Sequence, residues 1–151
     1  MVTFPVNFIF IHMNKKTGWL ACLLVSGLLL VSHSRAKAQS DAFAGAKVAL
    51  KSGNAKELAR HFNENIELVI ESENVEMDKV SQTQAELILR TFFQKNPAKD
   101  FAYVHQGASP EGSQYSTGTY QSVGKAYLVY IVVKQFGGKY RIDRIDFREK
   151  N

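Results

Sequence analysis

Apolar residues follow two periods along this chain, and the change of period separates helices from strands. Spacing of three or four residues recurs in three stretches, which predicts helices over 41–52, 54–62 and 81–96. Alternation of apolar and polar residues predicts strands over 66–71, 75–80, 101–108, 114–122, 126–136 and 139–148. The order is helix, helix, strand pair, helix and a four-strand antiparallel meander. This order places the chain in the α+β class, with helices on one face of an antiparallel sheet.

Short polar motifs support the predicted helix ends. Asn54 with Glu57, and Ser81 with Gln84, have the spacing of capping boxes, so each pair predicts a helix start. Gly53 predicts the end of the first helix, because glycine adopts the left-handed conformation without a steric penalty.

The segment 126–133 is apolar on both faces of its predicted strand. The helices can cover only one of these faces, so we expect a second copy of the chain to cover the other. The sequence therefore predicts a homodimer through the outer face of the sheet. The residues assigned to this dimer interface are Tyr127, Val129, Ile131 and Val133.

The first 38 residues have the order of a secretory signal peptide. Two lysines at 15–16 precede a 12-residue apolar run over 20–31, and small residues at Ala36 and Ala38 suit a signal peptidase. The run is shorter than the ~20 residues of a membrane-spanning helix, so we expect no stable anchor. Met13 is a better start than Met1, because it places the lysines first. We expect cleavage after Ala38, export to the periplasm or beyond, and a single domain over 39–151.

Removal of this leader changes the charge and the thiol chemistry of the protein. Four of the 19 basic residues lie in the leader, which leaves 15 against 14 acidic residues and a nearly neutral domain. A nearly neutral surface does not favour nucleic acid as a partner. The single cysteine, Cys22, also lies in the leader, and its surroundings fit a lipidation motif poorly. The mature domain is expected to contain no disulfide and no thiolate site.

The order of elements resembles the nuclear-transport-factor-2-like superfamily, which is also described as cystatin-like. The final hairpin over 137–145 is similar to the last hairpin of that superfamily. The segments 53–58, 85–89 and 92–97 are similar to a family of exported Bacteroidetes-type proteins, domain of unknown function 4783. The resemblance implies a curved sheet wrapped around the helices as a cone, in the order ααβ(β)αββββ. Some superfamily members are isomerases or dehydratases with a pocket inside the cone, but the resemblance implies no specific activity.

Residues for such a pocket can be named. His105 and Tyr103 are expected to share a strand face with Phe101, so they are the candidates for acid–base chemistry. Phe62, Phe92, Tyr103 and His105 are the candidate ligand-binding residues, although the phenylalanines suit a hydrophobic core equally well. Asp146 and its arginine neighbours have the pattern of surface ion pairs.

Three functions follow from these residues. The first is an exported, non-enzymatic domain that binds a small apolar ligand or an envelope protein. The second is a pocket enzyme of the isomerase or dehydratase kind that uses His105 and Tyr103. The third is a structural dimerisation module. The sequence has no spacing typical of a zinc or calcium site, so we expect neither a metal nor another cofactor.

Overall fold

A computed structural model describes residues 41–150 of the chain as three helices and a six-stranded sheet. The predicted signal peptide, the start at Met13 and the cleavage after Ala38 lie outside the described residues. The helical elements are a helix over 41–52, α2 (Ala55–Ala59), the single turn η1 (Glu71–Glu73) and α3 (Gln82–Lys95). The strands are β1 (Phe62–Ile70), β2 (Val75–Ser81), β3 (Ala98–Ala108), β4 (Gln114–Ser122), β5 (Ala126–Phe136) and β6 (Lys139–Glu149). The predicted order of elements is therefore confirmed.

The helix ends form where the polar motifs predicted them. Gly53 has a φ of 61°, so the first helix ends in the left-handed conformation. The Asn54 side chain accepts a hydrogen bond from the backbone N–H of Glu57 and caps α2. Ser81 and Gln84 form a complete capping box at the start of α3. One boundary differs, because Phe62, which was assigned to the second helix, is the first residue of β1.

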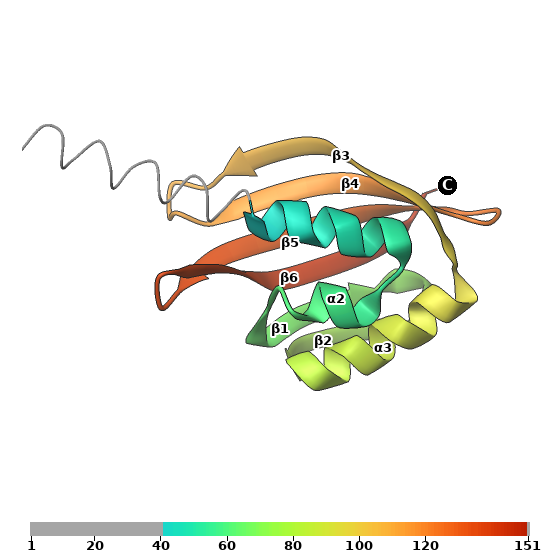
Figure 1. Cartoon of the computed structure of the whole chain (residues 1–151), viewed down its shortest axis with the longest axis horizontal. Coiled ribbons are helices and arrows are strands. Elements are labelled where there is room, and N and C mark those ends of the chain that lie inside the picture. The colour runs from blue at the N-terminus through green and yellow to red at the C-terminus, as the bar shows by residue number, and fades with distance from the viewer. Residues whose placement is uncertain (1–40, 151) are drawn as a thin grey trace, which may run out of the picture. The chain divides into compact units, whose positions relative to one another are not determined.

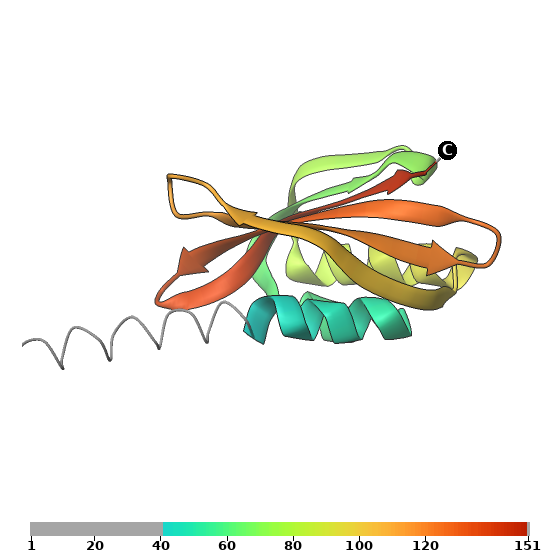
Figure 2. The same cartoon turned by 90° about the horizontal axis from the view of Figure 1, so that it is seen from above.

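The strands lie in the order β2-β1-β6-β5-β4-β3 within one twisted sheet that does not close on itself (Figure 1). Strands β3 to β6 form the predicted antiparallel meander. The prediction of a wholly antiparallel sheet is wrong in one respect, because β1 pairs with β6 in parallel. The helices lie on one side of this mixed sheet (Figure 2).

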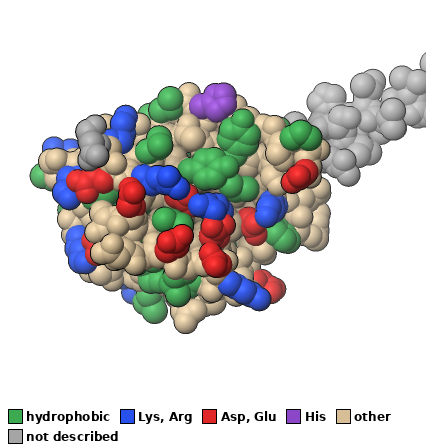
Figure 3. Space-filling view, turned by 180° about the vertical axis from the view of Figure 1, so that it is seen from behind, with side chains coloured by type: hydrophobic (Ala, Val, Ile, Leu, Met, Phe, Trp, Pro, Cys, Tyr) green, Lys and Arg blue, Asp and Glu red, His purple; other side chains and the backbone are tan. Residues whose placement is uncertain are grey.

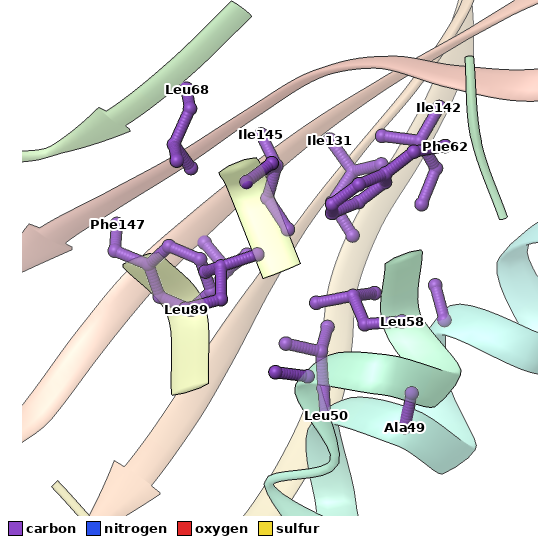
Figure 4. Close-up of a cluster of buried hydrophobic side chains, with 14 of the residues drawn as sticks. Ala49, Leu50, Leu58, Phe62, Leu68, Leu89, Ile131, Ile142, Ile145 and Phe147 are labelled. Carbon is purple, nitrogen blue, oxygen red and sulfur yellow. The ribbon is translucent and has the colours of Figure 1, made fainter. Parts of the chain in front are cut away.

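The hydrophobic core lies between the helices and the sheet. Leu50 and Leu58 come from the helices and face a layer of side chains from β1, β5 and β6, among them Leu68, Ile131 and Ile145 (Figure 4). All five of these side chains are fully buried. Within residues 41–150, no helix is long and apolar enough to cross a membrane.

Candidate functional site

Aromatic side chains fill the interior where the resemblance implies a pocket. The Phe92 ring of α3 lies 4.9 Å from the Phe147 ring and 5.1 Å from the Tyr127 ring, measured between centroids. Only 1% of Phe92 and 2% of Phe62 is exposed to solvent. These two candidate ligand-binding residues therefore contact mainly other parts of the protein core.

Two tyrosine hydroxyls of the interior are held by Asn96, the residue that follows α3. Tyr120 donates a hydrogen bond of 2.6 Å to the backbone oxygen of Asn96, and Tyr127 donates one of 2.8 Å to its side-chain oxygen. Buried hydroxyl groups need such partners, because an unpaired one costs about 1–3 kcal/mol. The two hydroxyls therefore fix the end of α3 against β4 and β5.

The prediction that His105 and Tyr103 share a face of β3 is wrong. Tyr103 lies opposite Gly118 of β4, whereas His105 lies opposite Thr117, so Val104 is an extra residue in the strand. Such a bulge shifts the alternation of side chains by one position. Tyr103 points inward and donates a 2.8 Å hydrogen bond to the Phe43 oxygen. His105 is exposed on the outer face, so the two side chains do not converge on one site.

Two inward tyrosines make folding stability sensitive to high pH. Burial raises the pKa of Tyr103 and of Tyr120 well above the ordinary value of 10.0. The unfolded chain therefore loses these protons first as the pH rises. The stabilisation is fully present below pH ~10 and decreases above it, by up to about 1.4 kcal/mol per pH unit for each group.

Urea unfolding between pH 8 and 11 measures this effect. We expect the free energy of unfolding to fall steeply above pH ~10, and Tyr103→Phe to remove part of that slope. A stability that stays constant up to pH 11 would contradict the burial of both hydroxyls.

The β5 side chains that were predicted to lie on the outer face of the sheet lie on its inner face. Tyr127, Val129, Ile131 and Val133 are all buried beneath the helices, with at most 1% of each exposed. They cannot form an outer dimer interface, because they already belong to the core of one copy. The outward side chains of this strand are Leu128, Tyr130 and Val132.

These outward residues belong to a surface that we call the outer sheet face. Its aromatic part crosses three strands: the His105 and Tyr115 rings lie 5.9 Å apart, and the Tyr115 and Tyr130 rings 6.3 Å apart. Leu128, with 39% of its surface exposed, lies next to Tyr130 along the same face of β5. Figure 3 shows hydrophobic side chains gathered on this side of the molecule beside a band of charged ones.

The charged part of the outer sheet face is built around a buried carboxylate. Asp146 is only 2% exposed, and Arg144 donates two hydrogen bonds of 2.8 Å to its two oxygens. Arg144 also pairs with Glu67, and Arg148 lies 3.6 Å from Asp146. The hydrogen bonds to Asp146 raise the pKa of Arg144 further above its ordinary range. The expectation of a solvated surface pair is wrong for Asp146, because its neighbours exclude water.

A groove continues this charged part toward β2. It has a volume of about 370 Å³ and is lined by carboxylates and guanidinium groups together, namely Glu71, Glu76, Arg144 and Arg148, beside Val69 and Val75. The outer sheet face thus presents both signs of charge next to its apolar and aromatic side chains.

His61 lies against the first helix and away from the outer sheet face. Its ring occupies the space beside Gly45, where an added Cβ would come within 2.1 Å of it. Its Nε2 atom is buried and has no hydrogen-bond partner among the described residues. Burial lowers the pKa of this histidine, so the neutral form is favoured. His61 therefore packs two helical segments together.

The helices over one face of an open, mixed sheet define a nuclear-transport-factor-2-like α+β domain. A protein of unknown function with this fold from Silicibacter pomeroyi aligns with 79% of this chain and 98% of its own, with 14% identity and a TM-score of 0.56. A putative ketosteroid isomerase from Kribbella flavida aligns with 76% of this chain and 79% of its own, with 12% identity and a TM-score of 0.52. At these identities the likeness shows the fold alone.

The family is identified by a closer match. Residues 43–148 match the domain of unknown function DUF4783, and the chain therefore belongs to this family. The crystal structure of a DUF4783 protein from Bacteroides fragilis shares 29% identity, with 70% of this chain and 96% of that one aligned and a TM-score of 0.64. A comparison with the curated proteins finds no match.

Proposed function

We propose that this protein is a non-catalytic binding module of the cell envelope that works as a homodimer, paired through its outer sheet face. The observation that carries this proposal is the row of outward side chains on β5, Leu128, Tyr130 and Val132, in a sheet whose other face is already covered. Tyrosine and arginine, which flank this row, are the side chains that most often supply binding energy at protein interfaces.

The size of the outer sheet face supports a second copy as its occupant. Six strands, each about 4.8 Å wide and about 30 Å long, give a face of about 860 Å². A standard protein interface buries about 800 Å² on each partner. The available area is therefore close to what a stable dimer needs.

The charges of this face also suit a copy of itself. A twofold dimer brings the same surface of two chains together, so the surface must complement itself. The groove beside Val69 contains Glu71 and Glu76 together with Arg144 and Arg148. A twofold axis can thus place the arginines of one copy near the glutamates of the other.

The alternative functions have less support. An acid–base enzyme would need His105 and Tyr103 in one cavity, but they lie on opposite faces of the sheet. A small apolar ligand would need an apolar pocket of about 300 Å³ or more. The slot between α3 and the β1–β2 hairpin, lined by Ile70, Val75, Ile88 and Phe92, is about 200 Å³.

The mass of the domain over 39–151 in solution tests the proposal. We expect light scattering after size exclusion to give twice the chain mass at micromolar concentration. A monomer at 100 μM would overturn the dimer.

The proposed envelope location has its own test. We expect intact-mass analysis of the native protein to find a chain that begins after Ala38. A chain that keeps its leader would refute export with cleavage and leave the dimer proposal unaffected.

A further inference from the structure

A hollow lies at the start of β1, at the opposite end of this strand from the groove beside Val69. A break in the pairing of β1 with β6 creates this hollow. Phe62 pairs with Ile142 of β6, and the next pair along the ladder is Glu67 with Arg144. Four residues of β1 separate these pairs, against one residue of β6. The strand therefore bends away from β6 over residues 63–66. Its pairing with β2 begins at Asn65, and its pairing with β6 resumes at Glu67.

Positive side chains from two segments line the hollow that results. Arg60 follows α2, whereas Lys139 and Arg141 come from the start of β6. The lining also contains one carboxylate, that of Glu64. The volume of the hollow is about 410 Å³, which lies within the range of small-molecule sites.

Hydrogen bonds hold the positive side of the hollow in place. Arg141 donates through Nη1 to the backbone oxygen of Arg60, which ties β6 to the end of α2. Arg60 itself forms a 2.7 Å ion pair with Glu57. Gln82, at the start of α3, donates a 2.7 Å hydrogen bond to the oxygen of Ala59. These contacts fix the positions of Arg60 and Arg141 and do not involve the Lys139 side chain.

The other wall of the hollow is aromatic. Phe62 lies at its base and is almost completely buried, whereas Phe136, at the end of β5, is 38% exposed. A molecule bound in the hollow can therefore make an apolar contact with the Phe136 ring and an ionic contact with the nearby guanidinium and ammonium groups.

We propose that this hollow binds a small organic carboxylate with an aromatic or branched apolar part. Arg141 and Lys139 hold the carboxylate, because a guanidinium group can donate two parallel hydrogen bonds to it. Phe136 covers the apolar part. The site uses none of Leu128, Tyr130 and Val132, the residues that carry the proposed dimer, so it goes beyond that proposal.

Binding of 2-naphthoate to the domain over 39–151, measured by calorimetry or by NMR shifts, tests this inference. We expect saturable binding with a Kd of about 0.1–1 mM. The neutral analogue 2-naphthylmethanol should bind at least tenfold more weakly, because it lacks the charge that the site recognises. Saturation absent up to 10 mM, or equal binding of the neutral analogue, would overturn the proposal.

Variants locate the binding. Lys139→Gln and Arg141→Gln should each weaken naphthoate binding at least tenfold, and Phe136→Ala should weaken it to a similar degree. Lys125→Gln is the matched control, because this exposed lysine lies in the β4–β5 turn and pairs with Glu149. The Lys139 side chain forms no ion pair or hydrogen bond with the other residues in 41–150, so its variant stays informative if Arg141→Gln fails to fold. Unchanged affinity in Lys139→Gln, or an equal loss in Lys125→Gln, would show non-specific binding.

The two proposals can fail separately. The variant Leu128→Asp should bind 2-naphthoate with the affinity of the parent protein, whether or not the parent is a dimer. Loss of binding in that variant, with its fold intact, would overturn the independence of the two sites.

Discussion

Replacing Leu128 by aspartate should convert the proposed dimer into a monomer. Leu128 lies in the apolar row of the outer sheet face, so a second copy would take the new carboxylate out of water. Its cross-strand neighbour on β6, Arg148, is already paired with Asp146. Burial of an unpaired charge costs several kcal/mol, and we expect the dimer Kd to rise at least a hundredfold, equivalent to about 3 kcal/mol. Light scattering across a concentration series measures the change.

A leucine elsewhere on the surface supplies the matched control. Leu87 on α3 is 53% exposed, against 39% for Leu128, and it lies on a helix away from the outer sheet face. Leu87→Asp should leave the dimer intact and keep its free energy of unfolding within about 0.5 kcal/mol of the parent. Leu128→Asp should stay folded but lose the contribution that dimerisation makes to stability. A dimer that survives Leu128→Asp, or dissociates equally in Leu87→Asp, would place the interface somewhere else.

Replacing Phe92 by alanine should produce the largest loss of stability. Its ring contacts those of Phe93, Tyr120, Tyr127 and Phe147, with centroids between 4.9 and 6.1 Å away. Removing a buried phenylalanine costs about 3–5 kcal/mol, because a cavity remains where the ring was. In a domain of this size the Tm should fall by at least about 12 °C.

The same variant separates a packed core from a ligand cavity. If Phe92 lined an open cavity, its removal would cost much less, because few contacts would be lost. Phe136→Ala is the control, since Phe136 is 38% exposed and its removal should shift the Tm by less than about 4 °C. A loss of less than about 1 kcal/mol in Phe92→Ala would contradict the packed interior.

Local patterns in the sequence were sufficient to predict the elements and their order. The capping box at Ser81 and the glycine at position 53 are signals confined to a few residues, and both appear as predicted. The alternation over 114–122 gives β4 its observed limits for the same reason. Hydrogen bonds within a turn and the period of side chains depend only on neighbouring residues.

The choice of sheet face could not be predicted for β5. Its two sets of alternating side chains are both apolar, so periodicity marks the strand without showing which set lies beneath the helices. Leu128, Tyr130 and Val132 are as apolar as the set that is buried. Only the pairing of this strand with its neighbours settles the orientation.

The sequence did not predict the orientation of His105, the burial of Asp146 or the hollow near Phe136, for related reasons. The bulge at Val104 has no glycine or proline to mark it, and it turns His105 to the other face. A second bulge, at Asp143 of β6, precedes Asp146 and similarly displaces the alternation there. The hollow near Phe136 combines Arg60, which follows α2, with residues from β1, α3, β5 and β6, and no local pattern connects these segments. Long-range pairing, including the parallel contact between β1 and β6, determines all three features.

The central place of β6 has a consequence for the nascent chain. This strand lies between β1 and β5, yet it is the last strand of the domain to be synthesised. Until it emerges, the β1–β2 hairpin and the β3–β5 sheet remain separate, with their apolar sides open to water. Joining strands so distant in sequence carries a loop-closure cost that delays folding. The unfinished polypeptide should therefore depend on holdase chaperones until its final strand has been synthesised.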